Sequence, residues 1–418
     1  MPLSTVRGVA LYVGALLGPG LLVLPGLAAA EAGPASILAW AGLLVLSGLV
    51  AVVFARFGVE HPSGAGVARY ARLGLGAWAG RAVGWCFLSA IIGGAATVCY
   101  LGAGYLAASL GGGRGLTAVA AAVMLAVVLA ISLRGVQAST AVQLVLVGLL
   151  VLVIVVAVAG AAPSARAANW TPFAPRGWSS IGPAATVLML SFVGWEAIAP
   201  LTDRFADPRR QLPRVIGIAF AITTVVYLAL AAVTVAVLGS GAGTTVPMAA
   251  LLSRAVGDHG GTVAAATAVV LTIATVNAYL TGGAMLARSL TGGREFPRWF
   301  LTAIVVASGP GLVLLGTGRL SVTAAVSLPS AFFLVVYLGC MVSAYRVLTG
   351  WVRGAAAVAG AAIVVVLAYA RWSALPALVV VLAAAVVRRR VPVVPSLSPA
   401  SRSQDPSMPP CAASGAAG

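Results

Sequence analysis

Apolar runs of roughly 20 residues, the length that a helix needs to cross the hydrocarbon core of a bilayer, recur from one end of the chain to the other. Short polar segments separate them. The pattern predicts an all-α polytopic membrane protein of about twelve transmembrane helices. The expected spans lie near residues 7–31, 35–57, 81–110, 115–133, 137–161, 180–201, 213–239, 261–289, 299–317, 320–347, 354–371 and 373–388.

Several segments outside or within these spans predict further structure. Residues 61–80 form an expected inner loop that can fold as a short interfacial helix, and residues 247–256 can form a short outer helix over the bundle. Residues 203–214 hold a dense cluster of charges on the inner side. Ser308-Gly309-Pro310-Gly311 interrupts the ninth expected span, and the Pro-, Ser- and Ala-rich residues 391–418 are expected to be a disordered cytoplasmic tail.

The arginines indicate the orientation of the chain. All 25 basic residues are arginine, and placing the N-terminus inside puts 19 of them on the cytoplasmic side and 6 on the outer side. Because cytoplasmic loops are enriched in basic residues, this bias predicts that both termini are cytoplasmic. Topology therefore explains the net charge of +17 better than nucleic-acid binding does.

The composition excludes several classes of protein. Hydrophobic residues make up 61% of the chain and charged residues only 8%, which is far from the balance of a soluble domain. The four cysteines, Cys86, Cys99, Cys340 and Cys411, form no CxxC pair, so neither a metal site nor a disulfide framework is indicated. We expect no cofactor, and no cleavable signal peptide is apparent.

The first expected span contains a sequence that interrupts helices. Gly18-Pro19-Gly20 lies near the middle of this span. Proline cannot donate an N–H, and glycine offers little resistance to unwinding. Unpaired backbone groups are tolerated at membrane depth only inside protein or beside a water-filled cavity. The segment is therefore either part of a binding site or a simple kink in a packing helix.

Glu196 is an acidic residue expected at membrane depth, in the sixth span. Ionisable groups at this depth are costly, face the protein interior and often serve transport. A structural role, in which a neutral carboxyl bonds a neighbouring helix, is the alternative. Gly194 lies two residues before it and could loosen the same helix.

The first and sixth spans are interrupted at corresponding positions of two halves, spans one to five and six to ten. Paired interruptions of this kind indicate the binding site of a secondary transporter. An odd number of spans in each half gives the second half an inverted topology. Half-helix N-termini favour a carboxylate, and unwound carbonyls favour an ammonium group. A zwitterionic amino acid presents both groups and is therefore the predicted substrate.

These segments resemble the amino acid–polyamine–organocation superfamily, and within it most closely the L-methionine/branched-chain amino acid exporter family. The matching motifs are Gly14-Ala-Leu-Leu-Gly18-Pro-Gly20-Leu-Leu-Val-Leu-Pro25, His61-Pro-Ser-Gly-Ala-Gly66-Val-Ala, Gly84-Trp85-Cys-Phe-Leu-Ser89, Ser191-Phe-Val-Gly194-Trp-Glu196-Ala and Asp207-Pro208-Arg-Arg210-Gln-Leu-Pro213-Arg214. They cover about the first 290 residues, beyond which only the span pattern agrees.

The resemblance implies a fold of the LeuT type, with two inverted five-helix repeats and two peripheral helices. Residues 1–347 would form the transporter core, with repeats near 7–161 and 180–347. Residues 348–390 would form the peripheral helices.

The resemblance also implies roles for residues at the two interruptions. The implied substrate-binding residues are Leu16, Leu17, Gly18, Pro19, Gly20, Ser191, Phe192 and Gly194. Residues 18–20 would face the substrate carboxylate, and the carbonyls of residues 16 and 17 would face its amine. Phe192 resembles the family's aromatic gate, and Glu196 would be a proton-linked or gating group. Residues 207–214 would be an inner loop tied to gating.

Two departures from the family pattern change the expected chemistry. Some proton-coupled relatives carry a lysine on the fifth helix, whereas this span offers no charge between Arg134 and Arg166. Pro19 replaces a small hydroxyl residue, which removes one hydroxyl and one N–H from the carboxylate site. Carboxylate binding would then depend on Gly18 and Gly20.

Other spans are expected to line the cavity and to select the substrate side chain. The candidates are Ile91, Ile92, Gly93, Gly94, Thr97, Thr275, Asn277, Tyr279, Ser327, Pro329 and Ser330. Any of them could instead be a helix contact, the two adjacent glycines by close packing and Asn277 by an interhelical hydrogen bond. No arginine or carboxylate pair is expected at this depth, which favours neutral, apolar amino acids such as methionine and the branched-chain ones.

The sequence thus predicts a secondary transporter of neutral L-amino acids in the plasma membrane, working by alternating access and exporting its substrate by proton antiport. Proton-coupled uptake and amino acid exchange are alternatives, because one fold serves both directions. An intramembrane enzyme would need a motif such as HExxH, and a channel would need a filter or a charged ring. Neither pattern is found in the sequence.

Overall fold

The computed structural model describes residues 4–61, 66–134, 140–197, 205, 207–292 and 297–387, most of them helical. The α-helices are α1 (Thr5–Leu16), α2 (Leu24–Ala32), α3 (Ser36–Glu60), α4 (Gly66–Leu75), α5 (Ala77–Ser109), α6 (Arg114–Leu133), α7 (Thr140–Ala161), α8 (Ile181–Leu188), α9 (Pro208–Leu238), α10 (Pro247–Val256), α11 (Gly260–Thr291), α12 (Arg298–Gly316), α13 (Val322–Val347), α14 (Trp351–Tyr369) and α15 (Leu375–Val387). Three of the 3-10 helices belong to the candidate site, namely η1 (Pro19–Leu22), η6 (Met189–Phe192) and η7 (Trp195–Ala197).

The helices have the length and composition of membrane spans. Within the described residues, nine helical segments are long and apolar enough to cross a membrane. Three shorter apolar segments accompany them, Thr5–Leu16, Trp178–Phe192 and Arg371–Val386. The chain is therefore an all-helical, multi-pass membrane protein, as the apolar pattern predicts.

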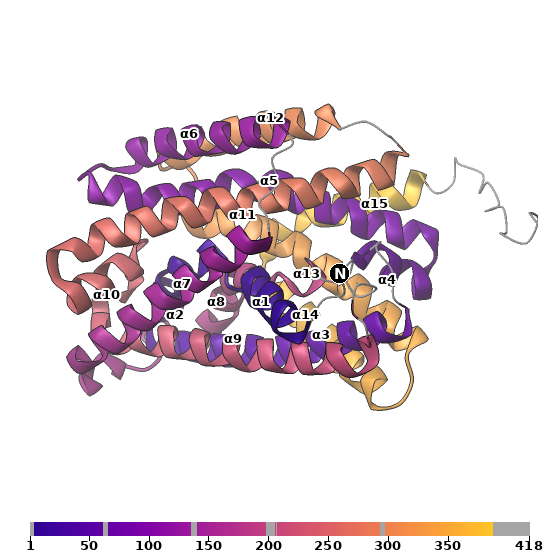
Figure 1. Cartoon of the computed structure of the whole chain (residues 1–418), viewed down its shortest axis with the longest axis horizontal. Helices are drawn as coiled ribbons and strands as arrows, with labels where there is room; N and C mark the ends of the chain where they lie inside the picture. Colours follow the sequence, from indigo (N-terminus) through magenta and orange to yellow (C-terminus); the bar gives the residue numbers. More distant parts are fainter. Residues whose placement is uncertain are drawn as a thin grey trace, which may run out of the picture.

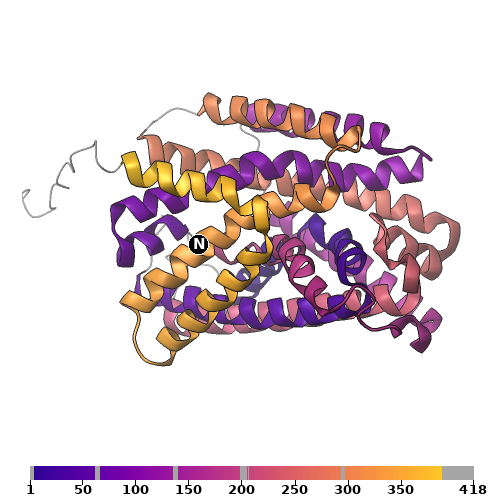
Figure 2. The same ribbon diagram turned by 180° about the vertical axis from the view of Figure 1, so that it is seen from behind.

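The long helices form two groups with short helices between them (Figure 1). Helices α5, α6, α11 and α12 run side by side along one edge of the bundle, and α3 packs on α9 along the other. The short helices α1, α2 and α8 lie between the two groups. Figure 2 shows the bundle from behind, where α14 packs on α13 and α15 packs on α5. The interior of the bundle is thus the place where the short helices meet.

The first interruption lies where the sequence predicts it. Helix α1 ends at Leu16, Gly18 is extended with φ −82° and ψ 172°, and η1 begins at Pro19. Proline suits the start of the new helix because the missing N–H would have had no helical acceptor there. A second helix segment, α2, then continues from Leu24.

The second interruption shortens the sixth expected span. α8 and η6 together end at Phe192, after which Val193 is extended and Gly194 has φ 146°, a conformation that favours glycine. Residues 180–201 are therefore not one continuous helix. The segment resumes as η7, and residues 198–200 lie outside the described part of the chain.

Two expected short helices are present, and one expected interruption is not. α4 lies within residues 61–80, and α10 covers the predicted residues 247–256. The ninth span was expected to be interrupted at Ser308-Gly309-Pro310-Gly311, but α12 runs through Pro310 without a break. A proline in a membrane helix can be accommodated when local adjustments or neighbouring groups satisfy the freed carbonyl. The expected disordered tail, residues 391–418, lies outside the described residues.

Candidate functional site

The two interruptions touch each other inside the bundle. A Cβ atom placed on Gly194 would lie 2.7 Å from the carbonyl oxygen of Ala15 and 3.1 Å from the amide nitrogen of Leu16. Only glycine allows the sixth span to approach the end of α1 this closely. η1 also contacts η6. The unwound segments of two spans, far apart in sequence, therefore form one structural unit.

A single tyrosine connects the two interruptions. The hydroxyl of Tyr227, on α9, lies 2.7 Å from the Leu16 carbonyl oxygen and 2.5 Å from the Ser191 carbonyl oxygen. A phenol has one hydrogen to donate, so it serves these two carbonyls in alternation. The side chain is fully buried, with its ring packed edge-on against Trp40 and Phe192.

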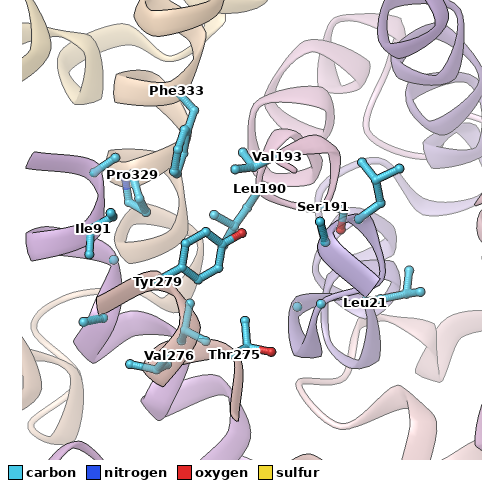
Figure 3. A pocket seen from close by; sticks show the side chains of 18 of the residues that line it. Leu21, Ile91, Leu190, Ser191, Val193, Thr275, Val276, Tyr279, Pro329 and Phe333 are labelled. Atoms are coloured by element: carbon cyan, nitrogen blue, oxygen red, sulfur yellow. The ribbon is translucent and has the colours of Figure 1, made fainter. Parts of the chain in front are cut away.

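A cavity of about 60 Å³ lies beside the interruptions (Figure 3). Helices α5, α11 and α13 supply its other walls. The lining residues are Ala15, Leu16, Gly18, Gly20, Leu21, Ala90, Ile91, Gly94, Ala95, Val98, Leu190, Ser191, Val193, Thr275, Val276, Tyr279, Leu280, Pro329 and Phe333. No residue in this lining carries a formal charge at neutral pH, so the cavity suits a ligand whose variable part is neutral and apolar.

Three side chains bring polar atoms to this lining: Ser191, Thr275 and Tyr279. Ser191 is 5% exposed, and its hydroxyl has no hydrogen-bond partner among the described residues. A buried hydroxyl without a partner is costly, which makes it a candidate ligand contact. In Figure 3 the ring of Tyr279 lies across the cavity with its hydroxyl directed toward Leu190.

Some backbone amides and carbonyls of the first interruption already have hydrogen-bond partners, and others do not. The Gly18 amide donates to the Leu16 carbonyl at 3.0 Å, and that carbonyl is also a partner of Tyr227. Neither group is therefore free for a ligand in this conformation. The Gly20 amide and the Leu17 carbonyl have no partner within the described residues. Gly18 lines the cavity, and a Cβ placed on it would meet nothing within 4 Å.

Glu196 lies behind the cavity and not in its lining. The carboxylate is 4% exposed, and its Oε2 accepts hydrogen bonds from the Gly194 amide at 3.0 Å and from the hydroxyl of Tyr337 on α13. Its Oε1 has no partner among the described residues. The carboxylate thus holds the backbone turn of the second interruption against α13.

Phe192 also points away from the cavity. Its ring packs on Trp40 and Tyr227, with centroid distances of 5.8 and 5.2 Å. It lines a second, much smaller cavity of about 10 Å³ together with Trp195 and Tyr337. In this conformation the aromatic rings at the main cavity are Tyr279 and Phe333.

Several expected cavity residues lie elsewhere because a helix presents only one face to the cavity. On α5 that face carries Ile91, Gly94 and Ala95, so the expected residues Ile92, Gly93 and Thr97 are not in the lining. The Thr97 hydroxyl lies 3.4 Å from the carbonyls of Gly93 and Ala325.

The same reasoning applies to α11 and α13. Asn277 faces α6, where its Oδ1 accepts a hydrogen bond of 3.2 Å from Ser132. Ser327 and Ser330 bond to carbonyls of their own helix. Gly194 and Leu17 contact the site without lining the cavity, and nothing is described of the Pro19 side chain.

The sequence did not identify several lining residues, namely Leu21, Leu190, Val193, Val276 and Phe333. The helical period, counted from Tyr279 and Pro329, could have suggested Val276 and Phe333, which lie three and four positions away on the same helices. Leu190 and Val193 flank the predicted Ser191 in the unwound segment, where no regular period applies.

The described residues contain no group of three His, Cys, Asp or Glu side chains that could hold a metal ion. The polar chemistry of the site therefore consists of backbone groups, hydroxyls and one carboxylate.

Comparisons of the sequence with known proteins identify the family to which it is similar. A family model described as amino acid permease matches residues 3–417. The uncharacterized amino acid permease YecA of Bacillus subtilis (strain 168) is 30% identical over 367 residues, which are 84% of this chain and 87% of that protein. The L-methionine/branched-chain amino acid exporter YjeH of Escherichia coli (strain K12) is 30% identical over 396 residues, or 90% and 93% of the two chains. The branched-chain amino acid permease BcaP of Bacillus subtilis (strain 168) is 25% identical over 241 residues, or 53% and 52%.

Proposed function

Because the chain belongs to the amino acid permease family of amino acid–polyamine–organocation transporters, and is thus a membrane transporter and not an enzyme, we propose that it carries neutral, apolar L-amino acids. Branched-chain amino acids and methionine are the preferred candidates. Two relatives are named for such substrates, the exporter and the branched-chain permease.

The cavity beside the two interruptions is the observation that carries this proposal. Its walls are apolar apart from the hydroxyls of Ser191, Thr275 and Tyr279, and the unwound backbone forms one side of it. An amino acid would place its charged backbone groups at the interruptions and its side chain among Ile91, Val276 and Phe333. A cationic or acidic side chain would meet no opposite charge there.

The free backbone groups suggest how the zwitterion binds. The Gly20 amide and the Ser191 hydroxyl would donate to the carboxylate. The Leu17 carbonyl, which lies beside the lining and not in it, would have to turn toward the cavity to accept from the ammonium group. The Gly18 amide and the Leu16 carbonyl, which the sequence also assigns to this role, become available only if their mutual hydrogen bond opens. The proposed ligand set therefore includes residues 16–20, Ser191, Phe192 and Gly194. The last two would not touch the substrate but would fix the backbone conformation of the second interruption.

The architecture proposed for this activity is the LeuT-type arrangement. Residues 7–161 and 180–347 would be inverted repeats, and residues 348–390 would add two peripheral helices, giving twelve spans. The bias of 19 arginines against 6 supports cytoplasmic termini in the plasma membrane. Alternating access would then expose the cavity to one side at a time.

Proton antiport in the direction of efflux is the proposed coupling, with Glu196 as the titrating group. This assignment is supported by the burial of the Glu196 carboxylate and by its hydrogen bonds, which it accepts from the Gly194 amide in the second interruption and from the Tyr337 hydroxyl. Uptake by proton symport, or exchange, is the second candidate, because one fold serves both directions of transport. Flux measured with imposed pH gradients of both signs separates the two directions.

Binding and flux together test the proposed substrate class. Purified protein is screened by thermal unfolding against the common amino acids, because a ligand that binds the native state raises the unfolding temperature. Radiolabelled leucine and methionine are then followed into and out of proteoliposomes. We expect stabilisation and flux with these two and with isoleucine and valine, and none with arginine or aspartate. Absence of flux and binding for every neutral amino acid would contradict the proposal.

A further inference from the structure

Tyr105 connects the first interruption to a short helix at one end of the bundle. It lies on α5 and is 1% exposed. Its hydroxyl donates to the Leu22 carbonyl at the end of η1 and accepts from the Met248 amide of α10 at 3.3 Å. One side chain thus joins two elements that are far apart in sequence.

The Leu22 carbonyl needs this donor because of how η1 passes into α2. In a continuous α-helix it would accept from the amide of Gly26. That amide donates instead to the Val23 carbonyl, at 3.0 Å. The change from 3-10 to α geometry therefore leaves the Leu22 carbonyl without a backbone partner, and Tyr105 supplies one.

The Met248 amide likewise has no acceptor within its own helix. The first amides of a helix have no intrahelical acceptor, and a side chain at the N-cap usually satisfies one of them. The N-cap residue of α10 is Val246, which cannot do so, and Pro247 follows it. The Tyr105 hydroxyl acts as the cap from another helix.

α10 is packed closely over this end of the bundle. A Cβ on Gly26 of α2 would lie 2.1 Å from the carbonyl oxygen of Thr244 and 3.0 Å from the Pro247 ring. Gly160 of α7 touches Ala255, and Gly260 at the start of α11 touches Leu252. Met248, Leu251 and Leu252 are fully buried as a result. By the proposed orientation this is the outer end.

We infer that Tyr105 is a positioning residue that couples the position of η1 to the docking of α10. The inference rests on the proposed alternating-access function, since it assigns a use to a movement of η1. The same hydroxyl holds both bonds, so a shift of η1 that carries the Leu22 carbonyl away leaves the hydroxyl free to turn and weakens the bond that caps α10. A ligand bound at residues 18–20, on the same short helix, acts on α10 through this contact.

Hydrogen–deuterium exchange of the full chain in lipid nanodiscs tests the coupling without any substrate. In Tyr105→Phe the amides of residues 248–256 should exchange roughly fivefold faster or more, as expected when a buried hydrogen bond is lost. The matched control is Tyr100→Phe on the same helix, whose hydroxyl interacts electrostatically with Arg114 but makes no hydrogen bond with the described residues. Unchanged exchange of α10 in Tyr105→Phe, or an equal acceleration in the control, overturns the inference.

A second measurement uses the unaltered protein and needs no variant to fold. Saturating L-leucine or L-methionine should change the exchange of residues 19–22 and of α10 together. A response of residues 19–22 without one in α10 overturns the coupling while leaving the proposed substrate intact. If neither amino acid changes exchange anywhere, the proposed substrate class is contradicted, and the comparison of Tyr105→Phe with Tyr100→Phe alone decides the coupling.

Discussion

The hydroxyl of Tyr337 donates a hydrogen bond to Oε2 of Glu196, joining α13 to the second interruption. The Gly194 amide donates to the same oxygen at 3.0 Å. Both bonds use lone pairs of this oxygen, so a proton placed on Oε2 would compete with them. The geometry of the interruption and the charge of this carboxylate are therefore physically linked.

Replacing Glu196 with glutamine should remove the pH dependence of leucine flux while keeping the protein folded. The glutamine carbonyl can still accept from Gly194 and Tyr337, but the side chain no longer titrates. Flux in proteoliposomes is measured from about pH 5 to 8, the range across which a physiological proton switch acts. The control is Tyr337→Phe, which keeps the titrating carboxyl and should keep a pH-dependent flux. A wild-type pH profile in Glu196→Gln would show that another group couples the proton.

Replacing Tyr227 with phenylalanine should lower stability more than an ordinary loss of a tyrosine hydroxyl. The buried Leu16 and Ser191 carbonyls share this donor, and of the two only the Leu16 carbonyl also accepts from the Gly18 amide, so the Ser191 carbonyl would be left without its partner. Leaving a buried carbonyl unsatisfied costs about 1–3 kcal/mol. Thermal unfolding in detergent measures the change, with Tyr369→Phe as the control because that side chain is 42% exposed. Equal unfolding temperatures for the two variants would contradict the bridging role.

The two interruptions and the two short helices could be predicted because glycine and proline act locally. Gly18-Pro19-Gly20 and Gly194 interrupt their spans wherever the rest of the bundle lies. Pro310 shows the limit of such signals, since the same residue type leaves α12 continuous. Whether a proline ends a helix depends on the groups around it, and the local sequence does not specify them.

The contacts of the site could not be predicted, because they join residues far apart in the chain. Tyr227 reaches Leu16 over 211 positions, and Tyr337 reaches Glu196 over 141. The choice between Ile91 and Ile92 as a lining residue depends on the rotation of α5 in the bundle, which only packing against α11 and α13 sets. Residue types suggested the substrate class, but the lining itself required the tertiary structure.

Replacing Gly194 with alanine should destabilise the protein strongly. The new methyl would lie 2.7 Å from the Ala15 carbonyl oxygen, in a backbone conformation with φ 146°. Strain and overpacking together predict a loss of about 2–4 kcal/mol. The control is Gly148→Ala on α7, where a Cβ meets nothing within 4 Å. That change should leave stability equal or raise it by up to about 1 kcal/mol, because alanine is the better helix former. Similar thermal unfolding of the two variants would refute the close approach of the two spans.

Replacing Ser191 with alanine should weaken substrate binding without lowering the stability of the protein. The hydroxyl has no partner among the described residues, so its removal should leave the unfolding temperature equal or slightly higher. If it donates to the substrate carboxylate, the affinity for leucine should fall roughly tenfold, the equivalent of one hydrogen bond to a charged group. Ser330→Ala is the control, since that hydroxyl bonds within α13 and does not line the cavity. Unchanged leucine affinity in Ser191→Ala would remove this residue from the proposed ligand set.

Replacing Gly18 with leucine should abolish binding of leucine and methionine while leaving the fold intact. A Cβ at this position meets nothing within 4 Å, and Gly18 itself lines the cavity. The backbone is extended with φ −82°, so any residue can adopt it without strain. The added side chain would therefore occupy the space proposed for the substrate without displacing a neighbour. Gly42→Leu, at an exposed and equally open position on α3, is the matched control and should bind as the wild type does. Binding is read from ligand-induced shifts in thermal unfolding, and wild-type shifts in Gly18→Leu would place the substrate elsewhere.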